Sequence, residues 1–236
     1  MSNGIKYNVW PIGKLPKQWQ RPELDSLAKR GYHIDDPRDA IDIFEKKLAS
    51  YAGSKYAVTV DCCSNGLFLS LKYFKASGQV TIPSRTYVSV PMQILHAGCQ
   101  VKFDDIEWSG IYQLKPYPII DGAVRFTKNM YVPETLHVVS FQIKKRLPIG
   151  RGGVILTDDE EAYRWLKMAS YDGRDLKKPY MDDNFEMMGY HMYMTPEDAA
   201  RGIILMDELP EVNEDTGSRN NYSDLSSKSI FINNDI

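Results

Sequence analysis

A lysine stands in a glycine-rich turn near the middle of the chain. Lys145 follows Ser140 by five positions, has Lys144 and Arg146 on either side, and is followed by a Gly-Arg-Gly-Gly run at 150–153. Lysine amines act as imine-forming nucleophiles where neighbouring cations and a tight backbone frame favour the neutral amine. A basic, solvated β-turn would use the same residues. This stretch alone is consistent with either.

Small polar residues follow a predicted strand in the first third of the chain. Residues 55–60 form a short apolar run that ends at Asp61, and Ser64 and Asn65 then precede an apolar helix that continues through Leu67. The N-terminus of a helix attracts anions through its free N–H groups and its dipole, and these side chains would add donors. The pattern predicts either a phosphate site or an ordinary N-cap on a crossover helix.

Two further strand ends carry side chains suited to chemistry. Tyr87 comes shortly after the predicted strand 79–83, and Asp121 follows the predicted strand 117–120. An aromatic ring can stack on a planar ligand. An acid at a strand end can hold a protonated nitrogen, although an isolated acid also serves to cap a turn.

Taken together, these residues have the properties that pyridoxal 5′-phosphate requires of a protein. Lys145 would form the imine, Asp121 would keep the pyridine nitrogen protonated, and Tyr87 would stack on the ring. A helix N-terminus would bind the phosphate. No other common cofactor uses this set, so we expect pyridoxal phosphate.

The elements that position these residues alternate between strands and helices. Strands are predicted at 55–60, 79–83, 100–103, 117–120, 136–141 and 154–156, a weak helix at 22–30, and stronger helices at 40–52, 67–74, 88–97, 160–170 and 196–209. Such alternation predicts an α/β fold with a parallel sheet, whose ligands bind beyond the carboxyl ends of the strands.

Composition restricts the class of partner and the cellular setting. The chain has 236 residues, a net charge of −2 and 25% charged residues, which gives no electrostatic case for nucleic acid or an anionic membrane. The three cysteines lack metal-ligand and disulfide spacings, so we expect no metal and a cytoplasmic protein. The sequence contains neither an apolar signal region nor an apolar run long enough to span a bilayer.

One main domain is expected from the length and the pattern. Residues 1–22 read as an extended arm with two aromatic anchors, Trp10 and Trp19. Residues 23–212 would form the large domain. Residues 213–236 turn polar and would be a C-terminal remnant.

Several short motifs share their order with a known family. They are Phe44-Glu45, Tyr51-Ala52-Gly53, Cys63 to Leu67, Ile82 to Ser89, Phe103-Asp104-Asp105, Ile120 to Ala123, Ser140 to Gly153, and Gly189 to Pro196 with Ala199-Ala200. In this order the chain resembles the DegT/DnrJ/EryC1/StrS family of pyridoxal-phosphate-dependent sugar aminotransferases, from about residue 20 to about residue 222. The resemblance implies the fold type I large domain, a three-layer α/β/α architecture with a mostly parallel central sheet.

The resemblance also implies roles for individual residues. The family's Ser-Phe, three residues, Lys spacing identifies Lys145 rather than Lys144 as the Schiff-base lysine. Asp121 resembles the acid on the pyridine nitrogen, and Tyr87 the stacking ring. The phosphate contacts implied are Ser64, Asn65 and Ser140. His191 stands where the family has an asparagine that reaches the phosphate of a neighbouring subunit, which implies a homodimer with shared active sites.

The chain departs from the family pattern in several places. Tyr193 stands for an arginine, Val124 for a glutamine or histidine that approaches the cofactor's phenolic oxygen, and Arg151 for a glutamate. Only residues 106–120 separate Asp105 from Asp121, where the family inserts a helix and a further strand. The C-terminal small domain is largely missing. We therefore expect a shortened, divergent member.

Two functions follow from this reading. The first is transamination of a nucleotide-linked keto sugar by an amino-acid donor such as glutamate, through Lys145, in amino-sugar or surface-polysaccharide biosynthesis. The second is an accessory or binding protein that keeps the fold and has lost transaminase activity. A different cofactor enzyme of the same fold is a third reading.

Overall fold

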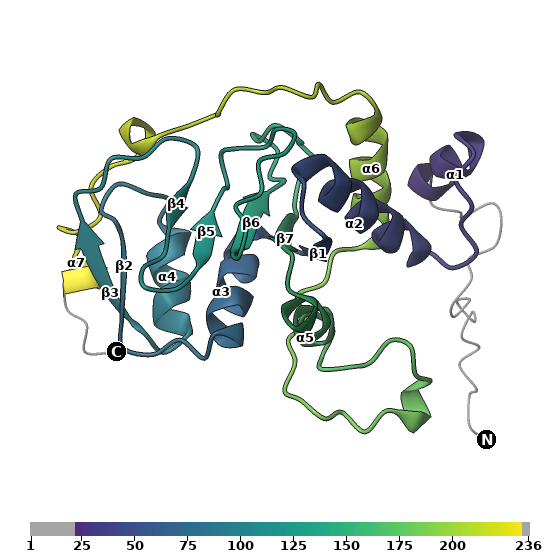
Figure 1. Cartoon of the computed structure of the whole chain (residues 1–236), viewed down its shortest axis with the longest axis horizontal. Helices are drawn as coiled ribbons and strands as arrows, with labels where there is room; N and C mark the ends of the chain where they lie inside the picture. The colour runs from purple at the N-terminus through teal and green to yellow at the C-terminus, as the bar shows by residue number, and fades with distance from the viewer. Residues whose placement is uncertain (1–21, 233–236) are drawn as a thin grey trace, which may run out of the picture.

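The computed structural model describes residues 22–232, so the predicted arm lies outside the described part except for Pro22. The helices are α1 (Pro22–Lys29), α2 (Asp39–Ala52), α3 (Cys63–Tyr73), α4 (Ser89–His96), α5 (Glu160–Ser170), α6 (Pro196–Asp207) and α7 (Ser229–Ile232). The strands are β1 (Tyr56–Val60), β2 (Gln79–Pro83), β3 (Gln100–Asp104), β4 (Tyr112–Gln113), β5 (Ile119–Asp121), β6 (Leu136–Ser140) and β7 (Gly153–Thr157). The alternation of strands and helices (Figure 1) confirms the predicted α/β class.

The main sheet is mixed in direction. Its order is β1-β7-β6-β5-β4, and β7 runs antiparallel to both of its neighbours. The strands β1, β6 and β5 therefore share one direction, and β5 pairs with β6 in parallel. The chain returns from β6 to β7 through the glycine-rich turn without a crossover helix, and such a direct return produces an antiparallel pair.

A second, two-stranded sheet is formed by β2 and β3, which pair in parallel. The segment 112–115 lies between it and the main sheet. Its first two residues form β4, which pairs antiparallel with β5. Lys115 then exchanges both backbone hydrogen bonds with Thr81 of β2, at 3.0 and 2.8 Å. This short hairpin, which the sequence pattern did not reveal, joins the two sheets.

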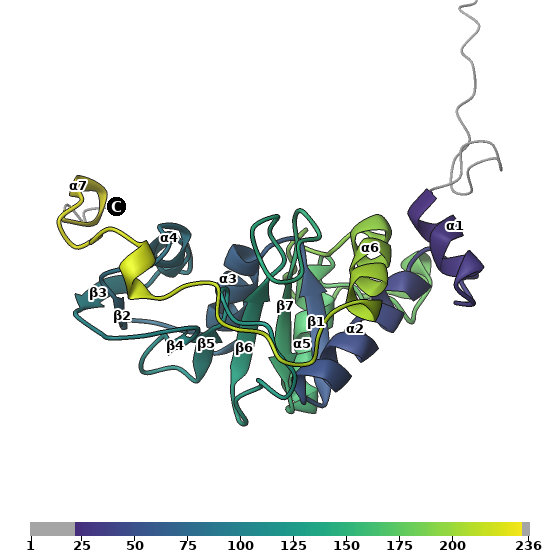
Figure 2. The same ribbon diagram turned by 90° about the horizontal axis from the view of Figure 1, so that it is seen from above.

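Helices cover both faces of the main sheet, which confirms the predicted three layers. On one face α3 and α5 pack on side chains such as Val58 and Val138, and α4 packs beside α3 against β3 of the second sheet. On the other face α2 and α6 pack on the alternate side chains, such as Ala57 and Val139. The two cores follow from the period of two along each strand. Figure 2 shows α1 and α7 at opposite ends of the molecule.

Two helix starts show how well local chemistry predicts boundaries. Thr195 precedes Pro196 and two acids, a pattern that predicts a helix start, and it does cap α6, because its hydroxyl accepts the N–H of Asp198. Asp35 and Asp36 precede Pro37 in the sequence, a pattern that predicts a cap of α2 at one of the two, and this prediction is wrong. The helix begins at Asp39, whose carboxylate accepts the N–H groups of both residues at 2.9 and 2.8 Å. A side chain inside the helix reaches back and satisfies the preceding turn.

An extended segment over residues 210–225, here called the C-terminal strap, runs from α6 along one edge of the sheet toward α7 (Figure 1). Backbone hydrogen bonds attach it to three loops: Thr216 N–H donates to Val124, Gly110 N–H to Gly217, and Leu225 N–H to Ser84. The strap includes residues 213–225, which belong to the segment predicted as a polar remnant. The predicted domain boundary between residues 212 and 213 stays a prediction.

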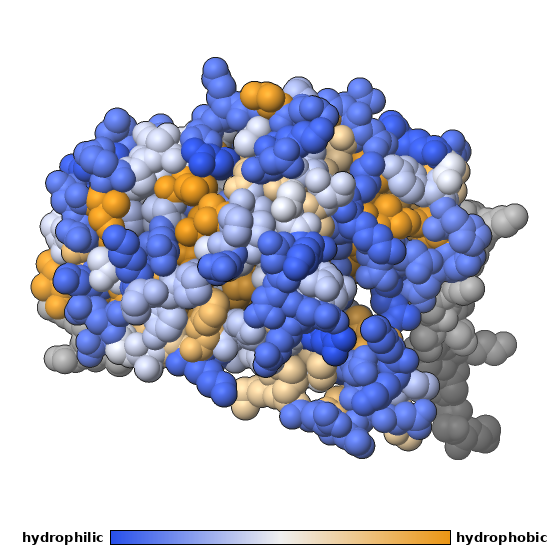
Figure 3. Space-filling view, viewed as in Figure 1, coloured by the Kyte–Doolittle hydropathy of each residue, from blue (hydrophilic) through white to orange (hydrophobic). Residues whose placement is uncertain are grey.

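The surface in Figure 3 is largely hydrophilic, with apolar residues in separate small patches. The most exposed large apolar side chains include Met181 and Met188, which lie in the long loop between α5 and α6. Across residues 22–232, no helix combines the length and the apolar character needed to cross a bilayer.

Candidate functional site

The turn that carries Lys145 connects β6 to β7. Phe141 is fully buried and anchors the start of the turn, and the Lys145 N–H donates to the carbonyl of Gln142 at 2.8 Å. At its end the Gly150 N–H donates to the carbonyl of Phe141 at 3.2 Å. Lys145 is half-buried and Lys144 is exposed. Lys145, the lysine that the spacing predicts as functional, is thus the less exposed of the two, and its role stays a prediction.

Asp121 ends β5 inside the protein, with only 5% of its surface exposed. One carboxylate oxygen, Oδ2, accepts the hydroxyl of Tyr112 at 2.5 Å, and Oδ1 accepts the N–H of Ala123 at 2.9 Å. Burial raises the pKa of Asp121, while these two hydrogen bonds and the charge of Lys145 act in the opposite direction. A buried carboxylate of this kind is a site for a cation or a protonated nitrogen.

Lys145, Asp121 and the first residue of α3 form one electrostatic cluster. Burial raises the pKa of the Cys63 thiol well above its usual value; the charge of Asp121 adds to this effect, and Lys145 opposes it. Lys145 also lowers the pKa of Asp121. The fold therefore brings together two residues predicted from different strand ends and sets them beside a helix N-terminus.

Two glycines allow α3 to start directly against the sheet. A Cβ on Gly153 of β7 would stand 2.7 Å from the backbone nitrogen of Cys63. A Cβ on Gly66 of α3 would stand 2.7 Å from the Cγ1 of Val138. Both distances are shorter than side chains tolerate. Any larger residue would push the helix N-terminus away from the site.

The N-termini of α3 and α4 meet at this edge. Ser64, in the first turn of α3, donates its hydroxyl to that of Ser89, the first residue of α4, at 2.7 Å. Helix geometry leaves N–H groups without helical partners at both ends, and both dipoles favour an anion there. Ser64 was predicted as a phosphate contact. Ser89 was not, although it stands in the matching motif.

Asn65 and Ser140 lie at the same edge with other contacts. The Asn65 amide donates to Asp61 Oδ1 at 2.8 Å, and Arg151 donates to Asp61 Oδ2 at 2.8 Å. Ser140 is buried, and its hydroxyl accepts the N–H of Gln142 at 3.4 Å. Their roles as phosphate contacts stay predictions.

Tyr87 and His191 lie at the open margin of the site. The Tyr87 side chain is 59% exposed, and it is close enough to Tyr222 of the C-terminal strap to affect the pKa of that residue. His191 is exposed and bonds Asp172 through Nδ1 at 3.0 Å. Its neighbour Met192 accepts the N–H of Asp61, so the segment runs beside the end of β1. The predicted contact with a second subunit stays a prediction.

The sequence reasoning missed two tyrosines near Asp121, Tyr112 and Tyr222, and Trp108, whose ring packs on both of them. Trp108 donates its indole N–H to the carbonyl of Arg85 at 2.9 Å, and it stacks on Tyr222 with ring centroids 5.8 Å apart. Burial raises the pKa of Tyr222, and the charge of Asp121 adds to this effect. Trp108 and Tyr112 could have been found, because they lie close to Asp121 in the sequence. Tyr222 could not, because no local pattern shows that the strap approaches Asp121.

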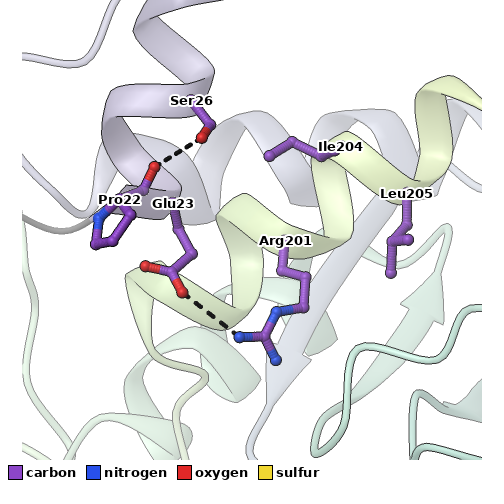
Figure 4. Close-up of a pocket in the computed structure, with 6 residues that line it drawn as sticks. All are labelled: Pro22, Glu23, Ser26, Arg201, Ile204 and Leu205. Atoms are coloured by element: carbon purple, nitrogen blue, oxygen red, sulfur yellow. Dashed lines mark hydrogen bonds and ion pairs between the residues drawn. The ribbon is translucent and has the colours of Figure 1, made fainter.

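A separate hollow of about 290 Å³ lies between α1 and α6 (Figure 4). Its lining residues are Pro22, Glu23, Ser26, Arg201, Ile204 and Leu205. Glu23 and Arg201 form an ion pair across it at 3.5 Å. It contains none of the predicted site residues and is distinct from the cluster at the strand ends.

Curated relatives match this chain at low identity. It is 24% identical over 88% of its length to the spore coat polysaccharide biosynthesis protein SpsC of Bacillus subtilis, of which it spans 65%. It is 25% identical over 68% of its length to the uncharacterized protein MJ1066 of Methanocaldococcus jannaschii, of which it spans 55%. The chain thus spans less than two thirds of each of these relatives.

Solved structures share the fold. A putative PLP-dependent aminotransferase from Bacillus cereus superposes with a TM-score of 0.64 at 19% identity, over 80% of this chain and 63% of that one. DesV of S. venezuelae, in complex with a ketimine intermediate, gives 0.64 at 17% identity over 80% of this chain and 61% of that one. The DegT/DnrJ/EryC1/StrS family model matches residues 22–120 and 132–224. The chain belongs to the DegT/DnrJ/EryC1/StrS aminotransferase family.

Proposed function

We propose that the protein binds pyridoxal 5′-phosphate and transaminates a nucleotide-linked keto sugar, with an amino acid such as glutamate as the donor. The observation that supports this most is the cluster of Lys145 and buried Asp121 beside the N-terminus of α3. A half-buried amine next to a buried carboxylate and an anion-binding helix end matches the needs of this cofactor.

The residues of the site fit the cofactor. Ser64 and Ser89 supply hydroxyls where two helix N-termini meet, which suits a phosphate dianion. Because burial raises the pKa of Asp121, a cation beside its carboxylate, such as a protonated pyridine nitrogen, would be stabilising. When bound, pyridoxal phosphate supplies an electron sink for the carbon atom that loses a proton.

The roles we assign to the protein's own groups follow from their positions. Lys145 would hold the cofactor covalently through Nζ. Once its amine is free, it would take the proton from the Cα of the amino donor. Asp121 would keep the ring nitrogen protonated, and Tyr87 would cover one face of the ring. Ser64, Asn65 and Ser140 would contact the phosphate, with His191 reaching that of a partner subunit in a homodimer.

The names of relatives support the substrate class. SpsC is named for spore coat polysaccharide biosynthesis. Among the structural neighbours, DesI was solved with its TDP-sugar product, and PseC of Helicobacter pylori is described as an aminotransferase of pseudoaminic acid biosynthesis. We propose by analogy a role in amino-sugar or surface-polysaccharide biosynthesis, in the cytoplasm.

Absorbance tests the proposal directly. Protein supplied with pyridoxal phosphate should show a band between about 410 and 430 nm that borohydride removes. Lys145→Ala should abolish the band, and Lys144→Ala should keep it, because Lys144 is exposed. A purified, cofactor-supplied protein without such a band would refute cofactor binding through lysine.

The C-terminal strap favours one alternative, cofactor binding without turnover. Tyr222 lies near both Asp121 and Tyr87, at the edge where a substrate would enter. Glutamate separates the two functions. A shift of the absorbance band on addition of glutamate supports transamination, and an unchanged band supports the binding protein.

A further inference from the structure

The hydroxyl of Tyr112 lies between Thr86 and Asp121 in the interior of the protein. It is 2.5 Å from the Thr86 Oγ1 and 2.5 Å from the Asp121 Oδ2. The exposed fractions of the three residues are 7%, 3% and 5%, in the order Tyr112, Thr86, Asp121. Water therefore competes little for these bonds.

The direction of the two hydrogen bonds can be assigned. Burial and the charge of Asp121 raise the pKa of Tyr112 well above its usual value, so its hydroxyl stays protonated. Its single proton is donated to the Asp121 carboxylate. The Thr86 hydroxyl must then donate to the Tyr112 oxygen. The result is a chain of two donors that ends at the Asp121 carboxyl group.

Backbone pairing and ring contacts hold Tyr112 in this place. Tyr112 of β4 pairs directly with Asp121 of β5, and directly opposed side chains lie on the same face of a sheet. Its ring packs on Trp108 with centroids 4.9 Å apart, and Trp108 is fixed by its hydrogen bond to Arg85. The tyrosine belongs to the short hairpin between residues 105 and 121, where this chain departs from the family's length.

Within residues 22–232, four titratable groups face Asp121 from different elements: Tyr112 from β4, Lys145 from the turn after β6, Cys63 from α3 and Tyr222 from the C-terminal strap. Of these, Tyr112 is a hydrogen-bond donor directly on the carboxylate. Lys145 acts through its charge and would be consumed in holding the cofactor. Tyr112 is therefore the side chain among these four that can hold Asp121 in every state of the site, together with the backbone N–H of Ala123.

We propose that Tyr112, backed by Thr86, is the positioning residue of Asp121. Its hydroxyl favours the ionised carboxylate and leaves the remaining lone pairs of that carboxylate for the ring nitrogen of the cofactor. The identity of that nitrogen rests on the proposed function. The donation from Tyr112 to Asp121 is a property of the cofactor-free protein.

The first experiment uses the cofactor-free protein with ¹³C-labelled aspartate carboxyl groups. An NMR titration follows the Asp121 signal, which Asp121→Asn identifies. Tyr112→Phe keeps the ring and removes the donor, so the pKa of Asp121 should rise above that of the unsubstituted protein. Thr86→Val should raise it less, because it removes a bond one step away.

Tyr117→Phe is the matched control. Tyr117 lies in the same hairpin, and its hydroxyl bonds the backbone of Ser77 rather than Asp121. The same chemical change there should leave the Asp121 titration unmoved. Equal titrations in Tyr112→Phe and the unsubstituted protein would overturn the inference, since they would limit Tyr112 to packing.

The second experiment measures the affinity for pyridoxal phosphate by equilibrium dialysis across pH. Loss of one hydrogen bond to a charged group should weaken binding by Tyr112→Phe about tenfold. The loss should grow as pH falls, because less Asp121 is then ionised. Unchanged affinity in Tyr112→Phe would overturn the inference alone. Absence of binding by the unsubstituted protein would overturn the proposed function. This result is distinguishable from the other, because it does not depend on the Tyr112→Phe variant.

Discussion

Asp121 shows how a functional residue can oppose folding. Burial raises the pKa of this acid, which means that the folded protein disfavours the charge that the proposed chemistry needs. Hydrogen bonds from Tyr112 and Ala123 and the charge of Lys145 offset only part of this effect. A cationic ligand beside Asp121 would therefore stabilise the charge of this carboxylate.

Asp121→Asn should stabilise the cofactor-free protein, and more so at high pH. Because the folded pKa of Asp121 lies above its unfolded value of about 3.9, the aspartate loses stability as pH rises through the folded pKa. Asparagine has no such dependence. Urea unfolding at pH 5 and pH 8 measures the difference, and an advantage that shrinks at pH 8 would contradict the expectation.

Asp215→Asn supplies the control of opposite sign. The hydrogen bonds and charge of Arg125 lower the pKa of Asp215, so its stabilising effect is present above the unfolded pKa and is lost in acid. This substitution should destabilise the protein at pH 8 and matter less at low pH.

His137 should make the protein sensitive to mild acid. Burial lowers the pKa of His137 to about 3, and its Nε2 has no hydrogen-bond partner in the described structure. A lowered folded pKa contributes stability above the unfolded value of about 6.5, and this is lost as pH falls toward the folded pKa. The free energy of unfolding should fall by up to about 1.4 kcal/mol per pH unit below that value.

Unfolding by urea between pH 4 and pH 8 measures this slope. His137→Leu removes the titrating group and should flatten it. A slope that persists in full in the variant would assign the acid sensitivity to other groups.

At the scale of elements, α3 depends on the glycines beneath its first turn. Gly153→Ala would place a methyl group against the Cys63 nitrogen, so the helix start must move. We expect a loss of about 1–3 kcal/mol in the free energy of unfolding, together with weaker pyridoxal phosphate binding. Thermal unfolding and equilibrium dialysis measure the two effects.

Gly31→Ala separates backbone strain from crowding. Gly31 has a φ of +88°, and a methyl group added there would meet no atom of the described residues within 4 Å, so alanine costs only strain. It should lower stability by about 1 kcal/mol and leave cofactor binding unchanged. Equal loss of binding in both variants would argue against a special role for the α3 start.

Elements with a long apolar pattern were predictable from the sequence, and short connections were not. The helix predicted at 160–170 is α5 with the same bounds, and β2 is the predicted strand 79–83. The strand ends also placed Asp121 and Lys145 in one region. In contrast, β4 has only two residues, which is too short to show a period. The direction of β7 depends on the short turn that precedes it, whereas the general alternation of strands and helices favours parallel strands.

At the scale of the whole molecule, the position of the C-terminal strap could not be predicted from the sequence. Its polar residues predicted a remnant, yet Arg125 pairs with Asp215 at 2.7 Å and Trp108 stacks on Tyr222. These contacts join residues about a hundred positions apart, which local pattern does not record. The strap closes the edge of the sheet where the candidate site lies.

Breaking the ion pair should loosen the strap from the sheet edge. Arg125→Ala removes the partner of Asp215, so the amides of Thr216 and Gly110, which bond across the strap contacts, should exchange hydrogen at least several-fold faster. Hydrogen exchange read by mass spectrometry measures this. Lys128→Ala, which removes the exposed pair with Glu211, is the matched control and should change these amides little.

The joint between the two sheets has a consequence for cooperativity. Thr86, Tyr87 and Ser89 follow β2, whereas Asp121 and Lys145 belong to the main sheet, and the backbone link between the sheets is the Lys115–Thr81 pair. Such a joint allows the β2–β3 unit to open as a sub-global unit. A ligand that contacts residues of both sheets would stabilise the two sheets against separate opening. Calorimetry of the ligand-free protein should then show a broadened or divided transition, which saturation with pyridoxal phosphate merges into a single sharp one.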